Sequence, residues 1–577
     1  MRLRSLVAGL VLLFGVGAAA AESWPAPKTT VFKADWSAVR AAVPVLPQHA
    51  EAEDPLAELT ALGSDFFPGV ADSAVPVLLP INIADYARDR AAGSANALDS
   101  YAPEFTFTKF FLAGPTGYDA VFSVRTRDVP DFANINFTNP VIIQMSGFNM
   151  LYDLPQTKGA IVQQPGDIAN AFPGIKRQIL ESTLRYSFEQ FGIPYVVSIQ
   201  CYEGPQRRTR LSCRNADRIA SRFLRALQLV GGNPSAATNT PPPGVSRPEQ
   251  QSDVFVYHPV GSLLPGTAMR SSTGDTDKTV YANIRFPLAT APAYVNSQSF
   301  MHGGDCNQTG RRPAPPGYRC RVNAKPLTRN EAAPENYAYP WRDNFCESRH
   351  FFVGQCPAGL GHQGQDIRPS SCETRDTNSK RCQPYRHSVV AARDGMILRE
   401  AWNDSFFLVV NAPGERLRFR HLHMNPRKLD EDGIVSGHTL KQGDPTGTVG
   451  NYNRRPGWTT THLHFEVQVP TRDGWVRVNP YMTLVASYEQ LINARGTEIK
   501  EQEQEQEPSA EPSPEISSEE AAAAVPIPPK APTKTANKVQ PQNKATPRAK
   551  QRHGKAKANQ RSKASAVSGT ARGKKRR

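Results

Sequence analysis

The sequence predicts a multidomain α+β protein: a mixed α/β N-terminal domain, a mainly antiparallel β domain towards the C-terminus, and a disordered tail. The chain has 577 residues, which is enough for two or three domains with their own cores. Residues 341–490 contain apolar stretches with strand-like alternation, separated by Gly, Asn, Asp and Pro. Residues 491–577 contain few apolar side chains and segregated blocks of charge, a composition typical of disorder.

The first 21 residues have the pattern of an export signal. Arg2 and Arg4 precede an apolar run over residues 6–16, and Ala19 to Ala21 offer a cleavage site. The apolar run is shorter than the roughly 20 residues that span a bilayer. We therefore expect a cleaved signal and no transmembrane anchor. The mature protein would be secreted across the inner membrane, to the periplasm or the outside.

Residues 22–232 are expected to form the mixed α/β domain, with no catalytic motif and no evident role. Residues 140–145 and 195–199 are apolar runs typical of buried strands. Helical spacing predicts a helix over residues 175–191, ended by Gly192, and a second helix that Gly231 and Gly232 close. Strand, helix, strand and helix in this order favour an α/β unit.

Two further segments separate this domain from residues 341–490. Residues 233–252 are rich in Pro, Ser, Thr and Asn, which indicates a linker. Residues 253–340 are expected to form a β-rich connecting region, with β structure over residues 279–284 as an example.

The positive charge of the chain lies in its tail. The net charge is +15, yet residues 526–577 contain 16 Lys or Arg and no acidic residue, which leaves −1 for residues 1–525. The tail lacks aromatic residues for base stacking, and an exported protein would not meet nucleic acid. We expect it to bind anionic cell-envelope polymers loosely.

The eight cysteines fit an oxidising compartment. The spacing contains no Cys-x-x-Cys pair, so a cysteine-ligated zinc is disfavoured. Proximity along the chain favours four short loops, although eight cysteines allow about 105 connectivities. The expected pairs are Cys201–Cys213, Cys306–Cys320, Cys346–Cys356 and Cys372–Cys382.

Three short segments hold five of the 12 histidines. They are His362-Gln363-Gly364-Gln365-Asp366, then His421-Leu422-His423, then His462-Leu463-His464-Phe465-Glu466.

Alternate residues of a strand share a face, so His462 and His464 would project together. Asp366, four residues after His362 and following Gly364, would complete a site of imidazole and carboxylate donors. Three such ligands leave a position for water, as in catalytic zinc sites. A lone His-x-His is weak, because an exposed strand face can also produce it, and imidazole accepts copper and other divalent ions as well.

The three segments together resemble the lysostaphin/LytM-type zinc metallopeptidases, peptidase family 23 of the metallopeptidases. Its H-x-G-x-D and H-L-H-F-E motifs match residues 362–366 and 462–466. Its Y-x-H-L segment is similar to residues 419–422, with Phe419 in place of the tyrosine. Residues 389–395 and 436–451 also resemble this family. The resemblance covers residues 341–485, and a longer insert over residues 368–387 departs from it.

The resemblance implies one zinc ion per chain, held by His362, Asp366 and His464 in a lysostaphin-like β fold. It implies His421 and His462 as the catalytic histidines that help to deprotonate water and stabilise the oxyanion. His423 would be a solvated histidine or a neighbour of the site.

The function implied by the resemblance is hydrolysis of the peptide cross-links of bacterial peptidoglycan by an exported zinc endopeptidase. The alternative is a non-catalytic relative that binds the wall and activates another hydrolase. Such relatives lose zinc ligands, whereas this chain keeps all three ligands and both accessory histidines. The sequence therefore favours the enzyme.

Overall fold

The computed structural model describes most of the expected N-terminal domain and most of the expected β domain. All described residues belong to one compact unit within residues 1–507. The expected signal over residues 1–21, the tail beyond residue 498 and the expected pairs Cys306–Cys320 and Cys372–Cys382 lie outside the described residues. The described ranges are 22–46, 54–125, 140–155, 161–163, 168–202, 211–257, 277–295, 321–322, 325–326, 341, 343–346, 351–356, 359–369, 383–400 and 404–498.

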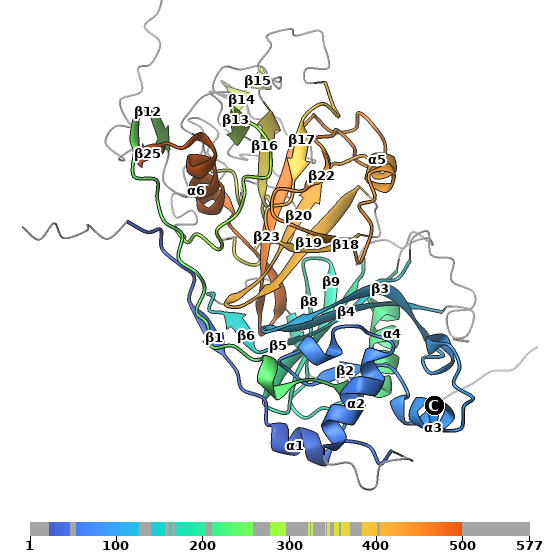
Figure 1. Cartoon of the computed structure of the whole chain (residues 1–577). Coiled ribbons are helices and arrows are strands. Elements are labelled where there is room, and N and C mark those ends of the chain that lie inside the picture. Colours follow the sequence, from blue (N-terminus) through green and yellow to red (C-terminus); the bar gives the residue numbers. More distant parts are fainter. Residues whose placement is uncertain are drawn as a thin grey trace, which may run out of the picture. The chain divides into compact units, whose positions relative to one another are not determined.

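The N-terminal half is built on a seven-stranded antiparallel sheet in the order β3-β4-β5-β10-β9-β8-β7 (Figure 1). Side chains of α2, α3 and α4 share one apolar core with this sheet. The strands are β3 (Phe105–Gly114), β4 (Gly117–Val124), β5 (Ile143–Phe148), β7 (Ile161–Gln163), β8 (Lys176–Leu180), β9 (Thr183–Gln190) and β10 (Ile193–Gln200). The helices are α1 (Trp36–Ala41), α2 (Pro55–Ser64), α3 (Ile83–Ala91) and α4 (Cys213–Ala226).

The helix expected over residues 175–191 is wrong, because this segment forms β8 and β9. Glu181 and Ser182 both have positive φ, 56° and 57°, as a two-residue hairpin turn requires. Leu184, Tyr186 and Phe188 alternate towards the apolar core, which is strand periodicity. The opposite face of β9, with Arg185 and Ser187, is buried as well. The segment therefore lacks a clear alternation of apolar and polar residues, and its apolar residues recur at a spacing that resembles that of a helix. The half is therefore an antiparallel α+β fold and not an α/β repeat.

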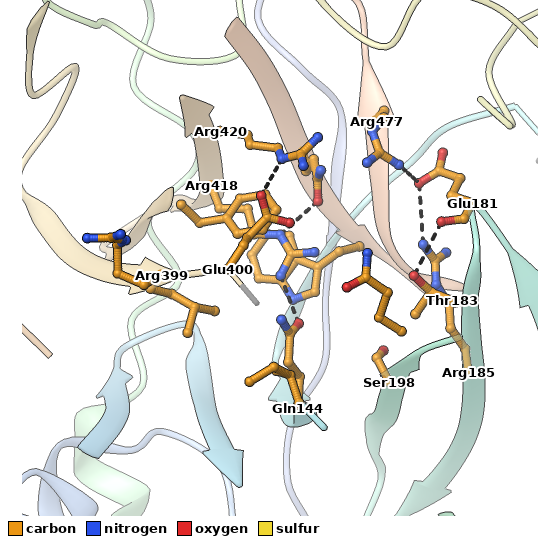
Figure 2. Close-up of a pocket in the computed structure, with 16 residues that line it drawn as sticks. Gln144, Glu181, Thr183, Arg185, Ser198, Arg399, Glu400, Arg418, Arg420 and Arg477 are labelled. Carbon is orange, nitrogen blue, oxygen red and sulfur yellow. Dashed lines mark hydrogen bonds and ion pairs between the residues drawn. The ribbon is translucent and has the colours of Figure 1, made fainter. Parts of the chain in front are cut away.

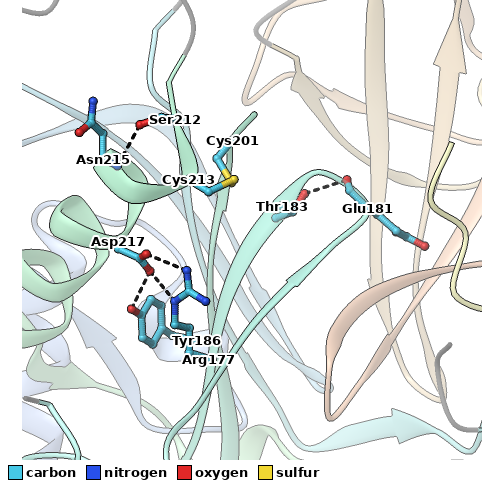
Figure 3. The surroundings of a disulfide bond; sticks show 9 residues. All are labelled: Arg177, Glu181, Thr183, Tyr186, Cys201, Ser212, Cys213, Asn215 and Asp217. Carbon is cyan, nitrogen blue, oxygen red and sulfur yellow. Dashed lines mark hydrogen bonds and ion pairs between the residues drawn. A yellow bond between two sulfur atoms is a disulfide. The ribbon is translucent and has the colours of Figure 1, made fainter. Parts of the chain in front are cut away.

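The second expected helix is confirmed as α4, although it ends at Ala226. Ser212 caps it by accepting a hydrogen bond from the backbone N–H of Asn215 at 3.2 Å. The expected disulfide Cys201–Cys213 is present, with 4.8 Å between the Cα atoms, and joins the end of β10 to the start of α4 (Figure 3). Residues 228–231, expected to end the helix, form β11 (Gln228–Gly231), which pairs with β2 (Val77–Leu79).

The C-terminal half is built on an eight-stranded sheet, antiparallel at each of its pairings, as expected. Its order is β13-β16-β23-β20-β19-β18-β21, with β24 paired to β23. Its strands are β13 (Ala293–Val295), β16 (Gln365–Pro369), β18 (Gly395–Arg399), β19 (Ser405–Ala412), β20 (Glu415–Leu422), β21 (Thr439–Leu440), β23 (Leu463–Thr471) and β24 (Gly474–Val478).

The two faces of β20 and β23 differ in character, and this difference positions the site. Leu463, Phe465 and Val467 of β23 belong to the apolar core, together with side chains of α6 (Tyr481–Ile492). His464 and Glu466 alternate with them and therefore occupy the opposite face.

Several expected boundaries differ in the structure. Residues 279–284 form no strand, although Val280 to Ala282 and Ile284 are buried. The fold continues past residue 490, because β25 (Arg495–Glu498) pairs in parallel with β12 (Gln251–Tyr257). The remaining elements are β1 (Thr29–Val31), β6 (Met150–Tyr152), β14 (Arg321–Val322), β15 (Lys325–Pro326), β17 (Ser388–Val390), β22 (Pro445–Thr448), α5 (Pro426–Glu431) and the 3₁₀ turns at Val70–Asp72, Leu98–Ser100 and Pro234–Ala236.

The two sheets contact each other through polar groups as well as apolar ones. Arg416, at the start of β20, is fully buried and forms an ion pair with Asp119 of β4. Arg185 of β9 donates to the backbone carbonyl of Asp473, in the turn between β23 and β24, at 3.0 Å. In the described part of the chain, no helix is long and apolar enough to cross a membrane.

Candidate metal centre

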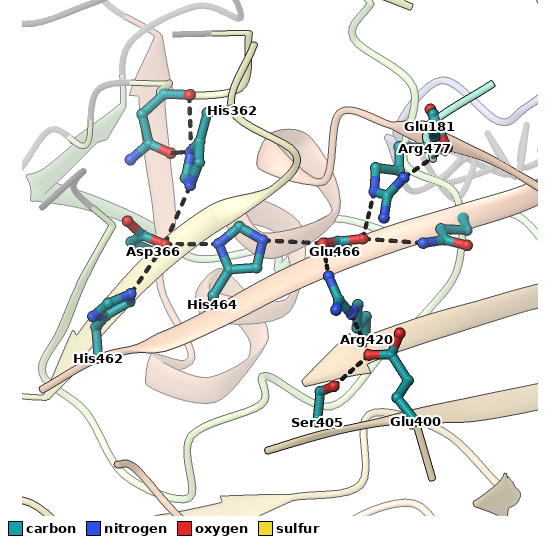
Figure 4. Close-up of polar contacts among 12 residues, drawn as sticks. Glu181, His362, Asp366, Glu400, Ser405, Arg420, His462, His464, Glu466 and Arg477 are labelled. Atoms are coloured by element: carbon teal, nitrogen blue, oxygen red, sulfur yellow. Dashed lines mark hydrogen bonds and ion pairs between the residues drawn. The ribbon is translucent and has the colours of Figure 1, made fainter. Parts of the chain in front are cut away.

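His362, Asp366 and His464 converge where β16 meets β23 (Figure 4). Asp366 lies directly opposite His464 in the register of the two strands, and His362 lies in the segment that leads into β16. One potential ligand atom from each residue lies within 4.8 Å of the others. All three side chains are buried, with exposed fractions of 5% or less. The structure thus brings together the three residues expected to bind zinc.

Gly364 explains how the loop before β16 comes so close to β23. A Cβ atom at this position would lie 2.2 Å from the backbone oxygen of Phe465, a distance that real Cβ atoms do not show. The glycine is therefore needed for the close approach of these two backbone segments.

Hydrogen bonds decide which ring nitrogen of His362 carries a proton, whereas both ring nitrogens of His464 face carboxylate oxygens. Nδ1 of His362 lies 3.1 Å from the backbone oxygen of Asn344 and therefore donates to it. Nε2 of His464 lies 3.2 Å from a carboxylate oxygen of Glu466, which can only accept. The remaining nitrogens, Nε2 of His362 and Nδ1 of His464, lie 3.3 and 2.9 Å from Oδ1 of Asp366.

If neutral His464 carries its proton on Nε2, as it must when Nδ1 binds a metal, these three atoms are acceptors with no hydrogen between them. With both imidazoles neutral, two nitrogen lone pairs and one carboxylate oxygen face a common point, which repels unless a cation or an extra proton lies there. Two imidazoles and one carboxylate are a donor set that zinc accepts, with a fourth position left for water. Hydrogen bonds from the histidine rings to oxygens of Asn344 and Glu466 are of the kind that orient metal-bound histidines. The residues present therefore fit a zinc ion.

Two further histidines lie beside this cluster. His462, fully buried just before β23, places Nε2 at 3.4 Å from Oδ1 of Asp366, while its Nδ1 donates to the backbone oxygen of Thr460 at 2.8 Å. His423 follows β20, and its ring centroid lies 4.7 Å from that of His462 and 6.1 Å from that of His464. Its Nδ1 donates to the backbone oxygen of Tyr452 at 2.8 Å.

His421, expected from the sequence to act beside His462, does not reach the cluster. It pairs with Phe465 across β20 and β23 and so shares the apolar face of the sheet. Its ring stacks on Phe406 at 4.6 Å between centroids, and it is fully buried. Neither ring nitrogen has a hydrogen-bond partner among the described residues. His423 lies at the cluster instead, because its positive φ of 72° turns the chain as β20 ends.

Burial and neighbouring charges shift the acid–base properties of the cluster. Burial would raise the pKa of Asp366, but His462 and His362 together hold it well below its usual range. Burial lowers the pKa of His462 well below its ordinary value, and it lowers the pKa of His423 to about 4. Burial opposes protonation of His464 too, yet hydrogen bonds to Asp366 and Glu466 raise its pKa. Without a cation, His464 is thus the ring that takes up the missing proton.

Glu466 extends the site into a buried charge network that the sequence analysis missed. Its carboxylate accepts from Arg420 Nη1 at 2.8 Å and from Arg477 Nε at 2.7 Å, in addition to His464. Arg477 also forms an ion pair at 2.7 Å with Glu181, from the turn between β8 and β9 (Figure 4). The alternation His462, His464, Glu466 could have placed this carboxylate beside the metal ligands. No local signal identifies Glu181, which lies far away in the sequence.

The disulfide Cys346–Cys356, expected from the sequence, supports the segment before the site. Its Cα atoms are 5.3 Å apart. The backbone N–H of Cys346 donates to the carbonyl of His362 at 3.1 Å. Phe345 and Val353 pack with the two cysteines in a small apolar cluster. The disulfide therefore stabilises the backbone that carries one of the three candidate ligands.

Comparisons with known proteins give limited similarity. No protein-family model matches the sequence, and no curated protein matches it. Among solved structures, one similar chain is described as a glycyl-glycine endopeptidase lytM from Ruminococcus gnavus, with 23% identity over 24% of this chain and a TM-score of 0.18. Another is the antimicrobial peptidase lysostaphin from Staphylococcus simulans, with 18% identity over 20% of this chain and a TM-score of 0.13. The matches cover 49% and 47% of those chains. TM-scores this low establish neither a shared fold nor a shared function, so the residues of the site are the basis for a function.

Proposed function

We propose that this chain is an exported zinc metalloendopeptidase that hydrolyses peptide cross-links of bacterial peptidoglycan. The observation that carries the proposal is the convergence of His362, Asp366 and His464 as three buried acceptors that face one point. The wall substrate follows from the resemblance of the three histidine segments to lysostaphin-type peptidases, and export follows from the residues before Glu22.

His362, Asp366 and His464 would hold the ion. A zinc ion in such a site lowers the pKa of water to about 7 and polarises a carbonyl group. The protein's part is to hold the three metal ligands rigidly, and Asn344 and Glu466 help by accepting hydrogen bonds from the two ligand rings.

His462 and His423 would handle protons and the developing negative charge. Both rings are anchored at Nδ1 by a backbone carbonyl, so each presents Nε2 as the free nitrogen. Nε2 of His462 has no hydrogen-bond partner in the described part of the chain, as a group that awaits a substrate or a water molecule would have. His421, which lies in the apolar core, takes no part in this proposal.

The rival proposal is a wall-binding protein that activates another hydrolase without catalysis of its own. It predicts no need for three convergent donors or for two more histidines anchored beside them. The full set is present here, which favours the enzyme.

The test combines metal analysis with digestion of purified peptidoglycan, followed by mass spectrometry, using the full chain. We expect one zinc per chain in the wild type, and loss of both zinc and hydrolysis in His362→Ala. His423→Ala and His462→Ala should keep the zinc and lose about 10²–10⁴-fold in rate. His438→Ala, an exposed histidine away from the site, serves as the control. Zinc retained in folded His362→Ala would refute the ligand assignment, and zinc binding without any hydrolysis would favour the rival.

A further inference from the structure

A cavity of about 100 Å³ lies between the two sheets, lined by β5, β9 and β10 on one side and by β18 to β20, β23 and β24 on the other (Figure 2). Holding one water molecule takes about 10–15 Å³ by this measure, so the cavity has room for a group of several non-hydrogen atoms. Gln200 in its lining is exposed, so the cavity reaches the protein surface. It is separate from the candidate metal ligands, none of which lines it.

The lining is rich in arginine. It contains five arginines and only two carboxylates, Glu181 and Glu400. Four of the five arginines have an ion pair with a carboxylate within 4.0 Å, some of them sharing the same partner. These four are Arg185, Arg399, Arg420 and Arg477.

Arg418 is the arginine of this lining for which the described residues supply no carboxylate. Its Nε donates to the amide oxygen of Gln468 at 2.8 Å, and its Nη1 donates to the amide oxygen of Gln144 at 3.0 Å. Its guanidinium also lies over the rings of Phe407 and Trp475, at 4.4 and 4.6 Å from their centroids. Neutral amides and rings orient the cation, while Asp119 and Glu400 act on it from beyond ion-pair distance. Burial outweighs their attraction and lowers the pKa of Arg418 to about 9.

Trp475 gives an independent indication of a missing acceptor. Its side chain is 3% exposed and lines the same cavity. Its indole Nε1–H has no hydrogen-bond partner among the described residues. Buried donors of this kind are usually satisfied by protein, water or ligand. A cation without a direct ion pair to the described residues and an unused donor therefore lie in the lining of one cavity.

We propose that this cavity is a binding site for a small oxyanion, a carboxylate or a phosphate group, with Arg418 as its charge partner and Trp475 as a hydrogen-bond donor. A planar guanidinium presents several donors in a geometry that matches either oxyanion. Orientation of Arg418 by two amides means that little further ordering is needed on binding. The site does not depend on hydrolysis at the metal centre.

The experiment is isothermal titration of the full chain at low ionic strength, with inorganic phosphate in one arm, sodium acetate in a second and sodium chloride in a third. We expect one site per chain with a dissociation constant of about 1 mM or below for phosphate, for acetate or for both, and none for chloride. The arm that binds more tightly tells phosphate from carboxylate. A wild-type protein that binds neither oxyanion overturns the proposal.

Two variants locate the site. Arg418→Met should weaken binding about tenfold or more, because it removes the charge that the oxyanion would pair with. Trp475→Phe keeps the ring and should weaken binding a few-fold through loss of one donor. Arg427→Met is the matched control, since Arg427 is exposed and pairs only loosely with Glu431, at 3.5 Å. Wild-type affinity in folded Arg418→Met overturns the proposal. Should that variant fail to fold, wild-type affinity in Trp475→Phe does so.

Discussion

Replacement of Glu466 by glutamine tests whether the buried charge network supports the metal centre. Glu466 is fully buried and lies at the junction of that network, in contact with His464 and with two arginines. Glutamine keeps the shape of the side chain and removes its charge. It also offers an amide N–H₂ where an oxygen had accepted from a cation. The substitution thus isolates the electrostatic part of the interaction.

The structure bounds the size of the effect. Removing one partner of a buried ion pair costs about 3–5 kcal/mol of unfolding free energy. Arg420 keeps Glu400 at 2.6 Å, and Arg477 keeps Glu181 at 2.7 Å, so neither arginine is left without a carboxylate. We therefore expect the lower end, about 3 kcal/mol. His464 loses the carboxylate that orients its ring, which typically weakens metal binding about 10–100-fold.

Two measurements separate these effects: urea unfolding of the metal-free protein, and zinc affinity by competition with a chelator of known affinity. The matched control is Glu415→Gln. Glu415 is 1% exposed and pairs with Arg393, which lies in the loop between β17 and β18. In the described part of the chain, no hydrogen bond or ion pair joins Glu415 to the histidines of the cluster. The control should lose comparable stability and keep its zinc affinity. Unchanged zinc affinity in Glu466→Gln, or an equal loss in Glu415→Gln, would refute the argument.

Three further variants probe the surroundings. His421→Phe should keep zinc and hydrolysis. Burial lowers the pKa of His421 to about 3, so the folded protein loses stability relative to the unfolded chain as pH falls below about 6.5, where the unfolded histidine takes up a proton. The free energy of unfolding in urea should therefore change between pH 7 and pH 5 by about 2 kcal/mol less in the variant than in the wild type. Loss of hydrolysis in this variant would return a catalytic role to His421. Replacing Cys346 and Cys356 together by serine should cost about 2–3 kcal/mol and weaken zinc retention, whereas unchanged values would show that the bridge does not support His362. Burial raises the pKa of Asp404 from 3.8 to about 6, so its contribution to the free energy of unfolding is fully present below pH 3.8 and is lost as pH rises through 6. In urea unfolding, Asp404→Asn should gain up to about 3 kcal/mol of stability at pH 8 and none at pH 4. An equal gain at both pH values would contradict this.

The C-terminal sheet was predictable because one face of its strands meets the core and the other does not. Phe465 and Val467 alternate with His464 and Glu466, and such alternation is visible in a sequence. The β8 to β9 segment was not predictable in this way, because both of its faces are buried and Arg185 interrupts the apolar pattern. The turn at Glu181 was also hidden, since neither it nor Ser182 is a residue typical of positive φ.

The three candidate ligands were predictable only through the family resemblance of their motifs, because spacing alone does not separate His462 from His464. The middle histidine was not predictable. Strand alternation puts His421 and His423 on one face, and the sequence gives no reason to prefer a break between them. The structure ends β20 at Leu422 and turns the chain at His423, which moves that ring to the side of His464. Conformation at a single residue therefore decides which of two neighbouring histidines reaches the cluster.

The polar contact between the two sheets bears on any attempt to produce the C-terminal half alone. Arg416 and Trp475 are almost completely covered in the full chain, and Asp119 of β4 pairs with Arg416. A fragment lacking the N-terminal sheet would present these groups, with Arg418, as one cationic and aromatic surface. The newly exposed aromatic and apolar part of this surface would promote self-association. Such a fragment would also adhere to acidic polymers, so its apparent affinity for envelope material would reflect the truncation and not the native protein.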